Sequence, residues 1–218
     1  RATIDSARFS NEFGSVFSKD SNGYFRRSLV ESCVVNKAIT IAGGKEIFPF
    51  TASLYGDKEK KYVFGIDPAS ENDNLALVIL ELNGEHRKIV YSWTMNRKFH
   101  IKLVQEKLVK ENDYFGYCAR KIRTLLDRFP SEAIGIDSQG GGIALMEALH
   151  DLDKLRDGEQ PIWPIIDPDK PRASDGEKGL HIIHPISFSS ADWVSKANTG
   201  LRKDLEDKVC LFPKFDAA

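Results

Sequence analysis

The chain has 218 residues, 41% of them hydrophobic and 29% charged, and its formal net charge is −1. This length suits one globular domain with an extension. Near neutrality excludes a histone-like positive surface, but not a DNA-binding protein whose basic residues lie on one face. No apolar run approaches the roughly 20 residues of a membrane span. Three cysteines without metal-ligand spacing, Cys33, Cys118 and Cys210, indicate reduced and buried thiols in a cytosolic protein.

Residues 1–60 differ in pattern from the rest of the chain. Phe9, Phe13 and Phe17 are interspersed with turn-forming residues, which predicts a partly helical arm that packs on another surface and leads into a main domain at 61–218. The chain starts with Arg1 rather than Met, so we expect it to be a fragment of a longer protein.

The main domain begins with three predicted strands, at residues 62–67, 75–82 and 87–95. The first two are apolar, and the third alternates between apolar and polar residues. Asn83-Gly84, between the second and third strands, is typical of a hairpin turn. These three strands are therefore expected to form an antiparallel meander.

Helices and further strands follow the meander. In chain order we expect a helix at 100–129, a strand at 133–137, a helix at 143–152, a strand at 162–166, a mobile surface loop at 167–184, a helix around 193–205 and a short extended piece at 209–212. This order predicts an α/β fold with a ribonuclease H-like mixed five-stranded sheet and flanking helices. In such a sheet the fourth strand lies parallel to the first.

Two of the predicted strands end on an aspartate that is followed by turn-forming residues. These are Asp67, followed by Pro-Ala, and Asp137, followed by Ser-Gln and three glycines. Ligands and catalytic groups collect at the carboxyl ends of strands in open α/β sheets. Two carboxylates on parallel neighbours would repel each other unless a proton or a cation lies between them. The pattern therefore indicates a divalent metal site, whereas a helix N-cap or an Asx-turn at each aspartate is the alternative.

These segments, in this order, resemble the nuclease domain of the large terminase subunit of tailed bacteriophages. The resemblance rests on Gly65-Ile-Asp67-Pro-Ala, on Asp73, on Gly135-Ile-Asp137 and on Leu211-Phe-Pro213, together with the arm. It implies metal-dependent cleavage of concatemeric double-stranded viral DNA during genome packaging. It also implies a packaging ATPase domain before the arm, a portal ring and a small terminase subunit as partners, and the host cytoplasm as location.

The resemblance assigns roles to the acidic residues. It implies two Mg²⁺ or Mn²⁺ ions, with Asp67 bridging both and Asp137 binding one. The third catalytic acid is either Asp216 or a residue beyond Ala218. Asp73 is an outer-shell ligand or a turn residue.

Basic residues in two segments are candidate DNA contacts. Arg97 and Lys98 follow the third predicted strand, and Lys170, Arg172 and Lys178 lie in the predicted loop. Such residues would contact phosphates without reading sequence. Because acidic residues dilute its charge, the loop can equally be an ordinary solvated one.

Three other functions are compatible with the pattern. One is an actin- or sugar-kinase-like ATPase lobe, which also begins with a Gly-Ile-Asp strand. Another is a non-catalytic module that docks on a portal ring or regulatory subunit. The third is a junction resolvase or transposase-like nuclease.

Overall fold

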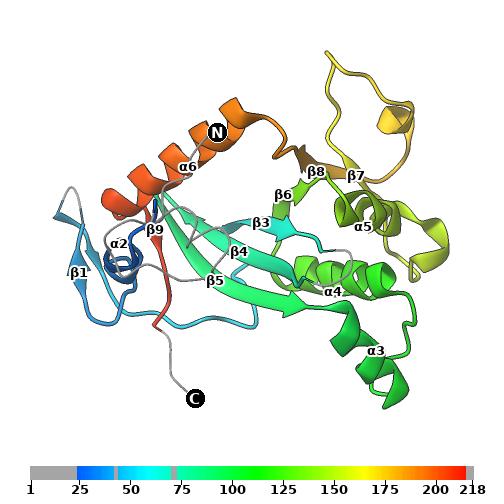
Figure 1. Ribbon diagram of the computed structural model, residues 1–218, viewed down its shortest axis with the longest axis horizontal. Helices are drawn as coiled ribbons and strands as arrows, with labels where there is room; N and C mark the ends of the chain where they lie inside the picture. Colours follow the sequence, from blue (N-terminus) through cyan, green and yellow to red (C-terminus); the bar gives the residue numbers. More distant parts are fainter. Residues whose placement is uncertain (1–23, 42–43, 70–72, 215–218) are drawn as a thin grey trace, which may run out of the picture.

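The computed structural model describes residues 24–41, 44–69 and 73–214 (Figure 1). Its centre is a seven-stranded sheet, and a two-stranded sheet lies to one side of it. From one edge to the other, the main sheet consists of β7 (Ile162–Pro164), β8 (Leu180–Ile186), β6 (Ser131–Asp137), β3 (Lys61–Asp67), β4 (Leu75–Asn83), β5 (His86–Met95) and β9 (Cys210–Leu211).

The strand directions bring several strand ends together. β3 pairs antiparallel with β4, and β4 pairs antiparallel with β5, which confirms the predicted meander. The other described neighbours pair in parallel, including β3 with β6. Among the described strands of the main sheet only β4 therefore runs against the rest. The carboxyl ends of β3, β5, β6 and β8 consequently lie along one edge, which we call the site edge.

The prediction of five strands was wrong, because the sheet also contains β8 and β9. β8 begins inside the predicted loop at 167–184 and continues two residues beyond its end. It pairs in parallel with β6 and buries Ile183 completely. Pro185 and the glycines before the strand obscure it in the sequence, and its pairing with β6 is a tertiary contact that local propensity does not report. β9 lies in the predicted extended piece and pairs with β5.

The predicted helix at 100–129 is two helices. The break follows α3 (Arg97–Gln105), where Lys107 has a positive φ of 57°. The next helix starts after Asp113, whose side chain accepts a hydrogen bond from the Gly116 N–H at 2.9 Å. The longer described helices are α3 (Arg97–Gln105), α4 (Tyr114–Arg128), α5 (Gly141–His150) and α6 (Ala191–Glu206). Within the described ranges, no helix combines the length and the apolar composition of a membrane-spanning segment.

Helices α4 and α5 pack side by side on one face of the sheet (Figure 1). Alternate strand residues point into this layer, as Phe64 and Ile66 do in β3. Leu125 of α4 and Leu149 of α5 are completely buried against them. This packed face forms the main core, and it fixes β3 and β6 beside each other.

The described part of the predicted arm packs on the far end of the sheet. It contains α2 (Arg27–Glu31), β1 (Ile39–Thr40) and β2 (Glu46–Ile47). Val35 and Ile47 form a small core with Leu211 of β9. Cys33 and Cys210 form another with Leu205 of α6, and all three cysteines of the chain are free and buried. Phe9, Phe13 and Phe17 lie outside the described residues.

Candidate metal centre

Asp67 and Asp137 lie beside each other at the site edge. Each is the last residue of its strand, and β3 and β6 are parallel neighbours in which Ile66 lies opposite Ile136. Both aspartates line one cavity of about 400 Å³. The fold thus brings together the two acids that the strand pattern singles out.

The electrostatics of Asp67 record this proximity. Partial burial raises the pKa of Asp67, and the negative charges of Asp137 and Asp73 raise it further. The neighbouring negative charges therefore destabilise the ionised form of Asp67, and a bound cation would reverse this effect. Hard divalent cations such as Mg²⁺ take oxygen ligands, and one or two carboxylates plus waters suffice. The donor set of the site fits such an ion.

The site holds two close aspartates rather than a complete set of protein ligands. Within residues 24–41, 44–69 and 73–214, no group of three or more His, Cys, Asp or Glu side chains is arranged to hold a metal ion. Asp73 is exposed in the turn before β4. It affects Asp67 through its negative charge, which raises the pKa of Asp67. Asp216, the candidate third acid, lies outside the described residues.

Asp137 also shapes the turn that follows β6. Its Oδ1 accepts a hydrogen bond from the Gln139 N–H at 3.1 Å, which is an Asx-turn. The backbone N–H and the hydroxyl of Ser138 both donate to the Ile186 carbonyl, at 2.7 and 2.8 Å. The Asx-turn alternative is thus present at Asp137. It uses one carboxylate oxygen, Oδ1.

The glycine turn lets α5 begin immediately beside Asp137. Gly140 has a positive φ of 51°. A Cβ built on Gly142 would lie 1.7 Å from the carbonyl oxygen of Asp137, so only glycine fits there. The first turn of α5 is consequently held close to the acid pair.

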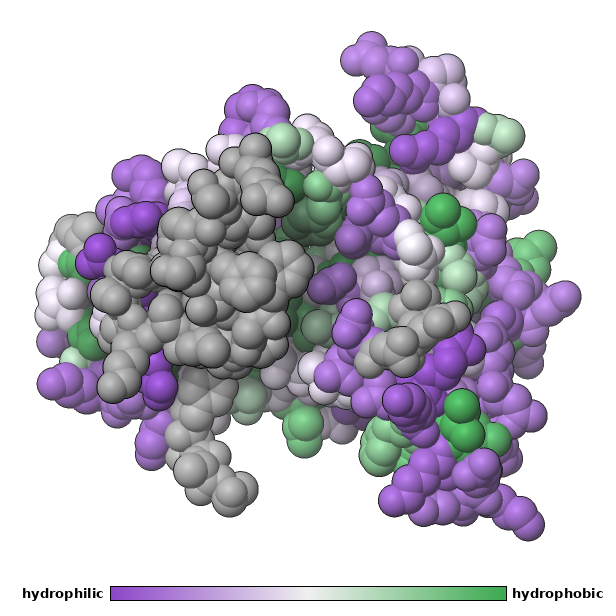
Figure 2. Space-filling model, in the orientation of Figure 1, coloured by the Kyte–Doolittle hydropathy of each residue, from purple (hydrophilic) through white to green (hydrophobic). Residues whose placement is uncertain are grey.

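The cavity has a floor of small residues and one apolar wall. Gly65, Ala76, Val78 and Gly135 from three adjacent strands form the floor, and Ile186 and Phe188 from β8 and the turn after it form the wall. Figure 2 shows apolar side chains in a hollow of the surface between α6 and β8, with hydrophilic residues around the periphery of the molecule. The sequence prediction missed the wall because it contained no strand in the place of β8.

Arg97 and Lys98 begin α3, directly after the carboxyl end of β5 and therefore at the site edge. The Arg97 guanidinium lies 5.0 Å from the ring centre of Tyr114 and 5.7 Å from that of Phe115. Phe115 in turn borders the start of α5, because a Cβ on Gly141 would lie 3.3 Å from its ring. Stacking on these rings therefore holds the Arg97 cation against the start of α4, at the site edge.

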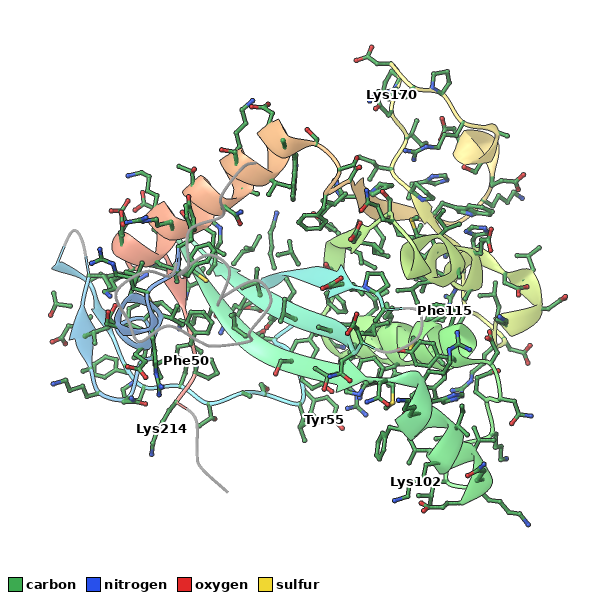
Figure 3. The ribbon with its side chains drawn as sticks, in the orientation of Figure 1. Phe50, Tyr55, Lys102, Phe115, Lys170 and Lys214 are labelled. Carbon is green, nitrogen blue, oxygen red and sulfur yellow. The ribbon has the colours of Figure 1, made fainter. Side chains whose placement is uncertain are left out.

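The other candidate DNA contacts lie in the connection between β7 and β8. Lys170, Arg172 and Lys178 are all exposed. Figure 3 shows Lys170 at the outer tip of this connection, far from the labelled Phe115 beside α5. Asp175 accepts a hydrogen bond from the Arg172 backbone N–H at 2.8 Å and dilutes the positive charge of the segment. The structure thus separates the five basic residues into two groups.

Solved structures of phage terminase nucleases resemble this chain. The large terminase nuclease of thermophilic phage G20c with bound magnesium aligns with a TM-score of 0.53 and 13% identity, over 88% of this chain and 75% of that chain. The same nuclease with bound zinc aligns with a TM-score of 0.51 and 12% identity, over 89% of this chain and 83% of that chain. No protein-family model and no curated protein matches the chain. Identities this low show a shared fold, and the predicted ribonuclease H-like fold of the terminase nuclease is confirmed.

Proposed function

We propose that this chain is the nuclease domain of a phage large terminase, an endonuclease that cuts concatemeric double-stranded DNA during genome packaging. The observation that carries the proposal is the meeting of Asp67 and Asp137 in one cavity at the carboxyl ends of parallel strands. Its fold is that of the G20c nuclease, which has been solved with magnesium, zinc and cobalt. The comparisons do not favour the ATPase-lobe or resolvase alternatives.

The metal requirement follows from the charge of the site. Asp67 and Asp137 would hold the Mg²⁺ or Mn²⁺ ions, two in number, and Asp73 would act as an outer-shell acid. Asp216 or a residue beyond Ala218 completes the set. Bound divalent ions supply the positive charge that activates the attacking water and neutralises the leaving oxygen.

The remaining residues of the site position the substrate. The glycine and alanine floor leaves room for a phosphate to approach the two acids. Arg97 and Lys98 contact phosphates at the site edge, and Lys170, Arg172 and Lys178 contact the duplex further out. Residues 1–60 form the arm that follows a packaging ATPase domain, and residues 61–218 form the nuclease domain. The portal ring and the small terminase subunit are its partners in the host cytoplasm.

A plasmid digestion assay tests this function, with divalent metal omitted, with Mg²⁺ and with Mn²⁺. Asp67→Asn and Asp137→Asn should each lower cleavage by a factor on the order of 10³ or more, because metal binding stabilises the transition state by several kcal/mol. Asp57→Asn is the matched control, since Asp57 precedes β3, at the opposite end of that strand from Asp67. Cleavage in EDTA, or full activity of both site variants, would contradict the proposal.

A further inference from the structure

The apolar wall of the cavity ends in two exposed aromatic rings. Phe188 lines the cavity together with Asp67 and Asp137, and it is 49% exposed. Trp193, in the first turn of α6, is 38% exposed. The two ring centres are 4.9 Å apart, and the rings stand nearly perpendicular at 87°. A large apolar surface is therefore exposed to water at the cavity that Asp67 and Asp137 line.

This ring pair is held in place by the turn that carries it. In the pairing of β6 with β8, Asp137 lies opposite Ile186. Phe188 comes two residues after Ile186. The hydroxyls of Ser187 and Ser189 lie 2.7 Å apart, on either side of Phe188. Ser190 caps α6 by accepting a hydrogen bond from the Trp193 N–H at 3.3 Å. The orientation of the rings is thus set before any ligand arrives.

Exposed aromatic rings beside a site for phosphate chemistry are suited to stacking on nucleobases. Every base has a flat π-face, so such stacking is tolerant of sequence. Bases inside an intact duplex are stacked on their neighbours and present only their edges. A ring on the cavity wall can therefore stack only on a base that has left the duplex.

We propose that Phe188, supported by Trp193, stacks on one unpaired nucleobase next to the phosphate that is cleaved at Asp67 and Asp137. This inference rests on the proposed nuclease function and narrows its substrate to DNA that is locally unpaired at the cut. The floor of Gly65 and Gly135 gives the sugar–phosphate backbone access to the acids, while the wall takes the base. The continuity of the wall with the acid pair favours a nucleotide over a protein segment as its occupant.

The test measures the coupling between one base and one ring. Three duplexes of the same sequence are compared: one fully paired, one with a single unpaired thymine and one with that thymine's base removed. Affinity for the 218-residue chain is measured in EDTA by fluorescence anisotropy. The chain should bind the duplex with the unpaired thymine about 5- to 150-fold more tightly than the abasic one, since stacking on an aromatic ring is worth about 1–3 kcal/mol per base.

Variants at the wall separate stacking from folding. Phe188→Leu should remove the preference for the unpaired base, and Phe188→Tyr, which keeps the ring, should retain it. Phe48→Leu is the matched control, because Phe48 is also an exposed phenylalanine, at 65%, but lies after β2. Equal thermal unfolding midpoints for the four proteins confirm that the fold is intact.

Two results overturn the inference, and they differ in what they say about the nuclease. If metal-dependent cleavage requires Asp67 but Phe188→Leu keeps the full preference, or the wild type has none, then the stacking proposal is wrong and the nuclease proposal stands. If the chain neither binds nor cleaves any of the duplexes, both proposals fail.

Discussion

The two faces of the main sheet use residues of very different size. On the packed face, under α4 and α5, Ile66, Ile79 and Ile136 are almost or completely buried. On the opposite face, their neighbours Gly65, Val78 and Gly135 form the cavity floor. One face therefore supplies the hydrophobic free energy of folding, and the other leaves space beside the acids. Substitutions on adjacent residues of one strand should consequently have different effects.

The largest expected contrast in stability lies between Ile79 and Val78 in β4. Ile79→Ala removes a completely buried side chain, and it should lower the free energy of unfolding by about 2–5 kcal/mol because a cavity remains. Val78→Ala changes a partly exposed side chain and should cost about 1 kcal/mol or less. Urea denaturation of both variants measures the difference. Equal losses would show that the two faces contribute alike.

Filling the open face should reduce activity more than stability. In Gly135→Val the new Cβ would lie 3.0 Å from Cδ1 of Ile186, a flexible side-chain end that can shift. Valine also suits a strand better than glycine does. We therefore expect unchanged or increased stability, but a loss of cleavage of up to about 100-fold, because the substrate is displaced from Asp137. Comparing thermal unfolding with cleavage rates checks this, and normal cleavage would show that the hollow does not receive substrate.

The sequence predicted the meeting of Asp67 and Asp137 better than it predicted the number of strands in the sheet. Asp67 and Asp137 end apolar runs, and the physical rule that parallel strands share an edge was enough to bring them together. The glycines after Asp137 were equally informative, because a helix that starts against a strand end leaves no space for a Cβ at Gly142. A local sequence pattern is thus sufficient to place a residue when its position depends only on the strand and turn to which it belongs.

The parts that were missed depend on contacts between distant segments. β8 contains Pro185 and alternates imperfectly, and it becomes a strand because β6 and β7 are available as partners on its two sides. Phe188 then reaches the cavity because β8 runs beside Asp137. The break between α3 and α4 was missed for a different reason, since the helical spacing of α4 was extended back across the turn at Lys107. Sequence spacing alone does not reveal which neighbour stabilises a short strand.

Charge on the outer loop should have a smaller effect than these packing changes. Replacing Lys170, Arg172 and Lys178 by alanine should weaken DNA binding. It should also reduce the slope of log affinity against log salt by about 0.9 for each phosphate that the protein no longer neutralises. Stability should be unaffected, because all three side chains are exposed. Binding measured across a salt series gives the slope.

A triple replacement of Lys37, Lys45 and Lys58 is the matched control for charge. These exposed lysines belong to the segment before β3, away from the site edge. The control should leave the salt slope near that of the wild type. An equal change in both triple variants would indicate a general charge effect rather than a DNA contact made by the loop.

The smallest effect concerns pH, and it should have opposite signs on the two sides of the sheet. Beneath the packed face, burial alone would raise the pKa of Asp113, but hydrogen bonds from Lys154 and from the Gly116 N–H lower it overall. At the open cavity, burial and the charges of Asp137 and Asp73 raise the pKa of Asp67. Ionisation of Asp113 therefore stabilises the folded protein, whereas ionisation of Asp67 destabilises it in the absence of metal.

The effects of Asp113 and Asp67 on stability can be distinguished by measuring the free energy of unfolding against pH in EDTA. The contribution of Asp113 is complete above its unfolded pKa and is lost as the pH falls through its lower folded pKa. Asp113→Asn keeps the helix cap. It should lower the free energy of unfolding by up to about 1 kcal/mol at neutral pH and leave it unchanged in acid. The cost of ionising Asp67 is absent below its unfolded pKa and grows as the pH rises through its raised folded pKa. Asp67→Asn should therefore be stabilising at neutral pH, and a loss of stability there would show that the acid pair is not under mutual repulsion.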